Sequence, residues 1–266
     1  MAYQEVYAGW KADPEAFWME AAKAIDWMKP PSHALEASKA PLYGWYDDAV
    51  CNVCWNAVDR HVEAGHGDRT AIIYDSPITG AKGKTSFAEL QAQTAALGGA
   101  LQAQGVGKGD RVVIYMPMIP EALVAMLACA RIGAVHSVVF GGFAAPELAV
   151  RIDDARPKAI LAASCGLEPG RTIAYKPLVD AAIGMSDHKP DAVIVFQRDQ
   201  LRAELNEERD LDWAEATAAA TPADCVPVGG MDPLYILYTS GTTGQPKGVV
   251  RPSAGYMVAL AWTMGA

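Results

Sequence analysis

The sequence lacks long hydrophobic runs and an obvious targeting segment. Its longest uninterrupted apolar run, residues 122–130, ends at Arg131 and is far shorter than the roughly 20 residues that a membrane-spanning helix needs. The first residues contain neither a basic segment nor an apolar core, so they do not resemble a secretory signal. We therefore predict no membrane partner and a cytoplasmic location.

Positive charge is also scarce. Lys and Arg number 22 against 31 Asp and Glu, which gives a net charge of -9, and no basic run is long enough to follow a nucleic-acid backbone. We therefore expect no nucleic-acid partner. An acidic chain can still bind an anionic nucleotide, because local donors and dipoles define a binding site more than the total charge does.

Cysteine is rare, and the five cysteines of this chain favour reduced thiols over a disulfide framework. Cys51 and Cys54 form a CxxC, which could be a redox pair or half of a zinc site. No second CxxC or spaced His pair follows, and residues 52–58 have the spacing of a helix with one apolar face. We interpret both thiols as small buried hydrophobes and predict no metal site.

Two regions of the chain differ in pattern. Residues 1–65 hold five of the seven tryptophans and show no alternation of strands and helices, which predicts a mostly helical leader with aromatic packing anchors. Residues 66–266 alternate short apolar strands with helices. This alternation predicts an α/β fold with a layered, mainly parallel sheet and helices on both faces. Ligands of such sheets usually bind beyond the carboxyl ends of the strands.

The expected elements of the second region can be placed along the chain. Strands are expected over residues 71–74, 111–115, 135–140, 159–163, 192–196 and 234–238. Helices are expected from Ser86 to near Gly105, from near Pro146, and over residues 120–132, 176–183 and 255–264. Ser86 and Glu89 have the spacing of a capping box. The polar stretch 198–215 is predicted to be a surface excursion or a subdomain boundary.

The segment after the 234–238 strand carries the clearest chemical pattern, Thr239-Ser240-Gly241-Thr242-Thr243-Gly244-Gln245-Pro246-Lys247-Gly248. Its glycines permit tight turns with inward amides, its hydroxyls add donors and Lys247 adds a positive charge. These groups can surround a polyphosphate, although a plain surface turn would use similar residues. The segment is not a Walker A sequence and the chain has no GxGxxG, which disfavours P-loop NTPases and dinucleotide dehydrogenases.

Residues 235–248 resemble the signature of the adenylate-forming acyl-CoA synthetase superfamily. Similarity to its short-chain branch, the acetyl- and propionyl-CoA synthetases, extends over nearly the whole chain, including residues 56–62, 136–143 and 151–155. Propionyl-type members are more similar than acetyl-type members at Arg251, residues 170–172 and residues 175–178.

The resemblance implies an enzyme that joins a short carboxylate to ATP, releases pyrophosphate and passes the acyl group to CoA, with ATP, magnesium and CoA as co-substrates. It implies a catalytic Lys247 and phosphate binding by Thr239, Ser240, Gly241, Thr242, Thr243, Gly244 and Lys247. It implies CoA binding by Phe140, Gly141, Gly142 and Arg171. Glu168 stands where acetyl-type relatives carry a second arginine. His136, inside an apolar strand, is interpreted as a core histidine.

Family members carry their adenine-binding motifs, magnesium-binding motif and adenylation lysine downstream of the phosphate-binding segment. We therefore expect this chain to be the amino-terminal part of a synthetase, inactive alone and completed by the missing carboxy-terminal portion. Two alternatives stay open: another adenylate-forming ligase, and a short paralogue that binds nucleotide or a partner without chemistry. The tryptophan-rich leader favours the short-chain branch over other ligases.

Overall fold

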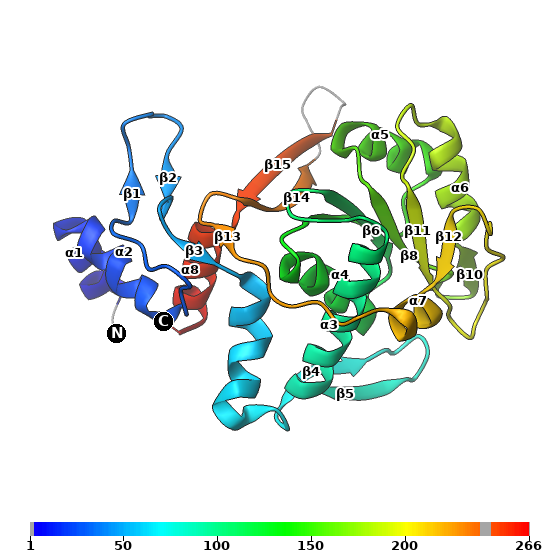
Figure 1. Ribbon diagram of the computed structural model, residues 1–266, viewed down its shortest axis with the longest axis horizontal. Helices are drawn as coiled ribbons and strands as arrows, with labels where there is room; N and C mark the ends of the chain where they lie inside the picture. Colours follow the sequence, from blue (N-terminus) through cyan, green and yellow to red (C-terminus); the bar gives the residue numbers. More distant parts are fainter. Residues whose placement is uncertain (1–2, 240–245, 266) are drawn as a thin grey trace.

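The computed structural model describes residues 3–239 and 246–265. Its central sheet has seven strands, namely β6 (Arg111–Met116), β7 (Val135–Phe140), β8 (Ala159–Ala163), β11 (Ala192–Phe196), β12 (Asp210–Asp212), β14 (Pro233–Thr239) and β15 (Lys247–Pro252). They lie in the order β12-β11-β8-β6-β7-β14-β15 (Figure 1). Neighbours from β12 to β14 are parallel, and β15 pairs antiparallel with β14. The expected α/β fold with a mainly parallel sheet is therefore confirmed.

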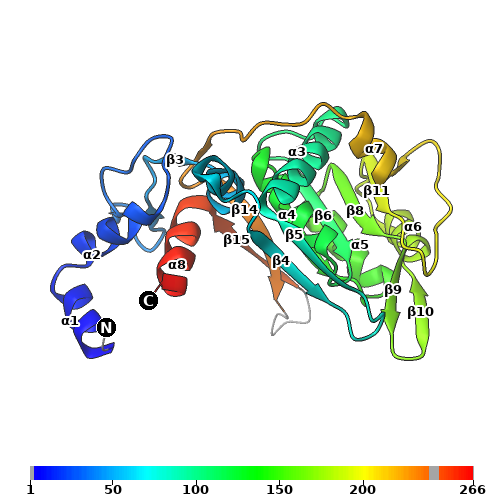
Figure 2. The ribbon, with the colours of Figure 1, turned by 90° about the horizontal axis from the view of Figure 1, so that it is seen from below.

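Helices cover both faces of this sheet, as Figure 2 shows. One face carries α3 (Phe87–Ala103), α4 (Pro120–Arg131) and α7 (Trp213–Ala219), and the other carries α5 (Ala145–Ala155) and α6 (Lys176–Met185). The capping box at the start of α3 is present, because the Ser86 hydroxyl accepts the Glu89 N–H while the Glu89 carboxylate accepts the Ser86 N–H.

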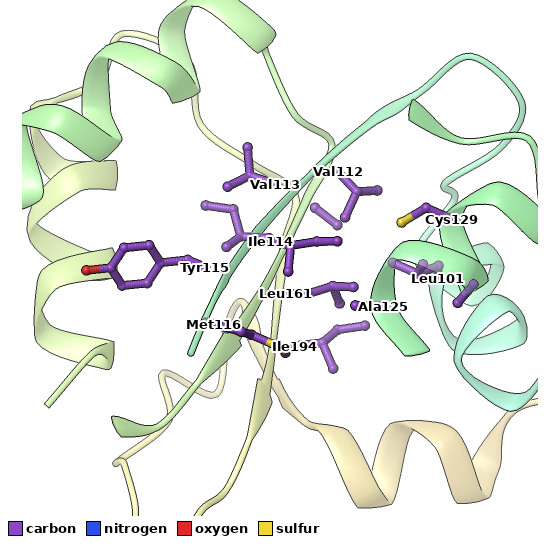
Figure 3. Close-up of a cluster of buried hydrophobic side chains, with 14 of the residues drawn as sticks. Leu101, Val112, Val113, Ile114, Tyr115, Met116, Ala125, Cys129, Leu161 and Ile194 are labelled. Atoms are coloured by element: carbon purple, nitrogen blue, oxygen red, sulfur yellow. The ribbon is translucent and has the colours of Figure 1, made fainter. Parts of the chain in front are cut away.

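The main hydrophobic core lies between the sheet and its helices (Figure 3). Ile114 of β6, Leu161 of β8 and Ile194 of β11 are fully buried, and Leu101 of α3 and Cys129 of α4 pack with them. Strands covered on both faces are apolar at nearly every position, which explains why their limits were visible in the sequence.

The leader is helical at its two ends. It comprises α1 (Tyr3–Ala12), α2 (Pro14–Ala21), the 3-10 turn η1 (Ala22–Ala24), the short strands β1 (Leu35–Glu36), β2 (Gly44–Trp45) and β3 (Val50–Cys51), and the wide helical turns η2 (Trp55–Asp59) and η3 (Val62–His66). Residues 25–51 contain no helix, which differs from the expected mostly helical leader. Prolines in this stretch disfavour helix because they lack an N–H donor.

Tryptophans anchor the leader to the last helix, α8 (Ser253–Gly265). The ring of Trp18 packs edge-on against Trp45 and against Trp262 of α8, with centroid separations of 5.9 Å in both cases. Phe17 packs on Trp262 as well, at 5.7 Å. These aromatic side chains act as packing anchors, as their composition suggested.

Some elements were not expected from the sequence. These are β5 (Lys82–Ser86), which pairs with β4 (Thr70–Asp75), and the hairpin of β9 (Cys165–Glu168) and β10 (Arg171–Ala174). The polar stretch 198–215 is more than a surface excursion, since it contributes β12 to the sheet and begins α7. Buried Asp210 obscures the apolar pattern of β12 and pairs with Lys176 at 2.6 Å. None of the helices that the structure describes is long and apolar enough to cross a bilayer.

Candidate functional site

The strands before and after the predicted phosphate-binding segment, β14 and β15, are the last two in the order of the central sheet (Figure 1). Thr239, the last residue of β14, lies opposite Lys247, the first residue of β15, and both are exposed. Ser240, Gly241, Thr242, Thr243 and Gly244 lie outside the described residues, so their roles stay predictions. The strand pairing holds Lys247 at the base of the segment.

Strand β14 is less buried than the sequence suggested. Of its residues only Leu234 is buried, and Leu237 is 49% exposed. The reason is the position of β14 next to the edge of the sheet. Only β15 follows it in the strand order, and β15 is itself exposed, with Val250 at 53%. Contacts made by individual side chains therefore matter more for positioning this hairpin than they would in the core.

Tyr238, immediately before Thr239, is attached to the last turn of α5. Its phenol donates a hydrogen bond of 2.5 Å to Oδ2 of Asp154. Burial, and after it this bond to Asp154, raises the pKa of Tyr238, so the phenol stays protonated and can donate. Gly248 lies opposite Tyr238, and a Cβ there would approach Tyr238 Cε1 to 3.2 Å and Asp154 Oδ2 to 3.4 Å. Glycine at this position therefore leaves room for β15 to pack beside the hydrogen-bonded side chains of Tyr238 and Asp154.

Arg151 connects the hairpin with the turn that follows β7. Its guanidinium lies 4.7 Å from the ring centre of Phe143 and 5.5 Å from that of Tyr238. Phe143 in turn packs edge-on against Phe140, with centroids 5.7 Å apart. We call these four residues the Phe140–Tyr238 row. The row joins the segment predicted to bind CoA to the segment predicted to bind phosphate, and cation–π contacts of this type contribute about 0.5–2 kcal/mol each.

Phe140, Gly141 and Gly142 leave the sheet at the carboxyl end of β7, the strand next to β14. Phe140 is 69% exposed. A Cβ on Gly141 would lie 2.6 Å from the Tyr175 ring, and one on Gly142 would lie 2.6 Å from the Phe140 ring. Close approach of these rings therefore requires both glycines. The parallel pairing of β7 with β14 brings both predicted subsites to the same edge of the sheet.

Arg171 begins β10 and lies opposite Glu168 of β9. Its Nε and Nη2 atoms lie 2.7 and 2.5 Å from Oε2 of Glu168, and both side chains are exposed. Glu168 is thus the ion-pair partner of Arg171. An exposed pair of this kind contributes about 0–1 kcal/mol, so an anionic ligand can displace the carboxylate at little cost.

His136 is buried in β7, and its ring lies 5.7 Å from Tyr235 of β14. Burial lowers the pKa of His136 to about 4, so the imidazole is neutral near pH 7. Within the described part of the chain, its Nδ1 atom has no hydrogen-bond partner. The burial agrees with the interpretation as a core histidine, whereas the Nδ1 atom without a partner among the described residues differs from a core histidine whose hydrogen bonds are all satisfied.

Metal-ligating side chains gather in two places among the described residues, and neither is at the hairpin. The two groups are Cys54 with Asp59 and Cys225, and His33 with Asp47 and Asp48. At the hairpin itself, the carboxylate of Asp154 already accepts the bond from Tyr238. A magnesium ion needs several oxygen ligands, which the described hairpin residues do not supply.

Sequence reasoning predicted roles for the segment between β14 and β15 and for the turn after β7, but it gave no role to Arg151 or Asp154. Both residues lie in the 151–155 stretch, which carried only a resemblance. Their contacts with Tyr238 depend on the packing of α5 beside β14, and the two residues of the hydrogen bond are 84 positions apart. No local pattern predicts such a contact.

Comparison with protein-family models matches residues 58–265 to the family described as AMP-binding enzyme. Residues 3–57 match the model of the acetyl-coenzyme A synthetase N-terminus. The two models together cover nearly the whole described chain.

Individual relatives agree with this assignment. The chain is 53% identical over 263 residues to acyl-CoA synthetase short-chain family member 3, mitochondrial, of Mus musculus, which covers 98% of this chain and 39% of the relative. It is 54% identical over 264 residues to an uncharacterized protein of Pseudomonas aeruginosa, and the match covers 99% of this chain and 42% of that relative. It is 46% identical over 261 residues to acetyl-coenzyme A synthetase of Streptomyces avermitilis, and the match covers 97% of this chain and 40% of that relative.

The chain thus spans about two fifths of the length of the curated relatives that it matches. The AMP-binding model alone matches more than half of the chain, and the hairpin of β14 and β15 lies within the matched range. This chain belongs to the AMP-binding enzyme family and begins with a segment of the acetyl-coenzyme A synthetase type.

Proposed function

We propose that the chain is the amino-terminal part of a short-chain acyl-CoA synthetase. The whole enzyme would activate propionate or acetate with ATP to an acyl-adenylate and pyrophosphate, and would then transfer the acyl group to the thiol of CoA. The observation that carries this proposal is the β14–β15 hairpin, which holds Lys247 opposite Thr239 at the base of the signature segment. The names of the mouse and Streptomyces relatives support the short-chain acid as the substrate class.

Lys247 is the residue that we assign to the adenylation step. Its exposed ammonium group would contact the β- and γ-phosphates and offset the negative charge that grows on the departing pyrophosphate. Donors from Thr239 and from residues 240–244 would surround the same phosphates. Magnesium would be a partner of the ATP phosphates, since the described hairpin residues do not form a metal site by themselves.

We assign CoA to the surface around the turn that follows β7. The exposed ring of Phe140 would offer a stacking face for the adenine of CoA, and Gly141 and Gly142 would let the ligand approach the backbone. Arg171 would exchange its bond to Glu168 for a charge-assisted bond to a CoA phosphate. The Phe140–Tyr238 row would keep the distance between this CoA-binding surface and the ATP site constant.

Two further parts of the proposal concern the surroundings of the chain. The carboxy-terminal portion of the same enzyme would complete the site, which the partial coverage of the relatives supports. The location would be cytoplasmic. The mouse relative carries the word mitochondrial in its name, so localisation of the tagged whole protein in its own cells is the measurement that decides this point.

Lys247→Ala in the whole synthetase tests the assignment of the chemistry. Carboxylate-dependent exchange of pyrophosphate into ATP should fall by about a hundredfold or more, because a charge that stabilises the transition state is lost. Lys84→Ala, at an exposed lysine of β5, is the matched control and should exchange at the unaltered rate. An unchanged rate in Lys247→Ala would reject the role of this lysine, and a parent enzyme without exchange on propionate or acetate would reject the synthetase itself.

A further inference from the structure

A buried cluster outside the predicted ATP and CoA sites brings together two cysteines that are about 170 positions apart in the sequence. Cys54 comes just before η2 and is fully buried, whereas Cys225 is half-buried in the connection between α7 and β13 (Val228–Gly229). Their Sγ atoms and a carboxylate oxygen of Asp59 lie within 4.8 Å of one another. The fold therefore brings together two thiols that no local sequence pattern connects.

The thiols surround a buried ion pair. Nη1 of Arg131 lies 2.8 Å from Oδ2 of Asp59 and 3.7 Å from Sγ of Cys54. The same carboxylate oxygen lies 3.8 Å from Sγ of Cys54 and 3.6 Å from Sγ of Cys225. A metal cation in this place would meet the positive guanidinium of Arg131 and a carboxylate that is already paired. The cluster therefore suits thiol chemistry better than metal binding.

The partner of Cys54 is Cys225 and not Cys51, the other residue of the CxxC. Cys51 lies in a separate apolar cluster with Val228, where burial raises its pKa to about 12, as expected of a buried hydrophobe. Cys54 differs, because a hydrogen bond with Cys225 and the charge of Arg131 lower its pKa although burial opposes them. Both CxxC thiols are fully buried, as interpreted from the sequence, but of the two only Cys54 lies beside a second thiol and a guanidinium.

We propose that Cys54 and Cys225 form an oxidant-sensitive thiol pair that closes to a disulfide in the folded protein. Cys54, whose thiolate the charge of Arg131 favours, attacks one oxygen of hydrogen peroxide, the O–O bond breaks, and the departing hydroxide takes up the thiol proton, which gives a sulfenic acid and water. Sγ of Cys225 then attacks the sulfur of Cys54, the S–O bond breaks, and the departing hydroxide takes up the proton of Cys225 as a second water. Two thiols are oxidised while one peroxide is reduced.

Local structure supports the closure. A disulfide needs the sulfur atoms at about 2.05 Å, so the side chains must rotate toward each other. Two backbone hydrogen bonds hold the connection in place on either side of Cys225, from Ala223 N–H to Ala95 at 2.9 Å and from Val226 N–H to Arg131 at 2.8 Å. The backbone thus stays at the cluster while the side chain of Cys225 turns. The positive charge of Arg131 favours the thiolate of Cys54 in the first step.

The disulfide would restrict the movement of the segment that leads from Cys225 to the β14–β15 hairpin. β13 follows Cys225 by three positions and pairs with β3 of the leader, and β14 begins shortly afterwards. A link to Cys54 would fasten this connection to the segment that precedes α3. Oxidation would thereby tie the approach to β14 to the leader at a second point.

The test is oxidation of the purified native protein with hydrogen peroxide, followed by alkylation of free thiols and mass spectrometry of the peptides. A peptide pair linked through Cys54 and Cys225 should appear, lighter by two hydrogen atoms than the reduced pair, and dithiothreitol should remove it. Cys225→Ala and Cys54→Ala should abolish the linked pair. Cys51→Ala is the matched control and should retain it, because Cys51 lies in the other cluster.

Three results would overturn the proposal. One is a sulfenic or sulfinic acid at either Cys54 or Cys225 with the other thiol still free after native oxidation. Another is a link between Cys51 and Cys54, which Cys51→Ala would remove. The third is a link between Cys54 and Cys225 that forms in denaturant but not in the folded protein.

Discussion

The phenol of Tyr238 donates a hydrogen bond of 2.5 Å to Oδ2 of Asp154, so the last turn of α5 holds the residue that precedes the segment predicted to bind phosphate. This bond matters because β14 is mostly exposed or half-exposed and has few core contacts to position it. Arg151 lies over the same phenol ring and adds a second constraint from α5. The position of the hairpin thus depends on one helix of the neighbouring layer.

Removing this hydrogen bond should slow adenylation without unfolding the protein. Tyr238→Phe keeps the ring under Arg151 but removes the donor, and a bond to a charged acceptor contributes about 1.5–3 kcal/mol. We expect pyrophosphate exchange by the whole synthetase to fall about tenfold or more, because the phosphate-binding segment loses its anchor. Tyr74→Phe on β4 is the control and should leave the exchange rate unchanged. Equal rates for all three proteins would show that the anchor has no part in catalysis.

The pair of Arg171 and Glu168 leads to a prediction about CoA. Arg171→Ala should raise the KM for CoA about tenfold and leave the KM for ATP unchanged, since one charge-assisted phosphate contact is lost. Glu168→Gln should lower the KM for CoA, because the guanidinium no longer has a competing carboxylate. Arg202→Ala, at another exposed arginine, serves as the control. If Arg171→Ala left the KM for CoA unaltered, the assignment of this arginine to CoA would be wrong.

Buried His136 should make the stability of the protein depend on pH. Its pKa is about 4 in the folded chain against 6.5 for the free side chain, so between these values the unfolded chain binds a proton that the folded chain does not. The contribution of neutral His136 is therefore complete above pH 6.5 and is lost as the pH falls toward 4, by up to about 3 kcal/mol.

Chemical denaturation at a series of pH values measures this effect. The free energy of unfolding of His136→Phe should fall less steeply between pH 6.5 and 4 than that of the parent protein, because phenylalanine keeps the ring contact with Tyr235 without titrating. His66→Gln, at an exposed histidine, should retain the parent slope. Identical slopes for His136→Phe and the parent would contradict the prediction.

The buried pair of Asp59 and Arg131 should be costly to break. Asp59→Ala leaves the guanidinium of Arg131 without its 2.8 Å partner at a site where both side chains are less than 10% exposed, and such single removals destabilise by about 3–5 kcal/mol. The midpoint of thermal unfolding should fall accordingly. Asp75→Ala, which breaks an exposed pair with Lys82, should cost less than about 1 kcal/mol. Similar losses in both variants would contradict the importance of burial.

Much of the central fold was predictable because its strands are buried on both faces. The limits of β7, β8 and β11 coincide with the expected ranges, since β8 and β11 are short apolar runs and only His136 and Ser137 interrupt the apolar residues of β7. Strand β12 escaped prediction because it is short and contains buried Asp210, whose charge is balanced by Lys176 from α6. Residues 25–51 of the leader differ for another reason, as their short strands and turns have no periodic pattern.

In the candidate site, too, some residues could be predicted from the sequence and others could not. Lys247 and the glycines at 141 and 142 belong to local motifs, so the sequence alone pointed to them. The partners that hold these motifs come from distant parts of the chain, as with Asp154 for Tyr238 and Tyr175 for Gly141. The pairing of Cys54 with Cys225 depends in the same way on tertiary structure, and the CxxC spacing suggested a different partner.

The position of β15 has a practical consequence for handling this chain. Among the described residues, β15 has a partner strand on one side only, and Val249 and Val250 are partly exposed on it. The free side presents a row of backbone N–H and C=O groups, which is a template for pairing with another strand. Concentrated preparations of residues 1–266 should therefore self-associate edge to edge unless a further strand covers β15.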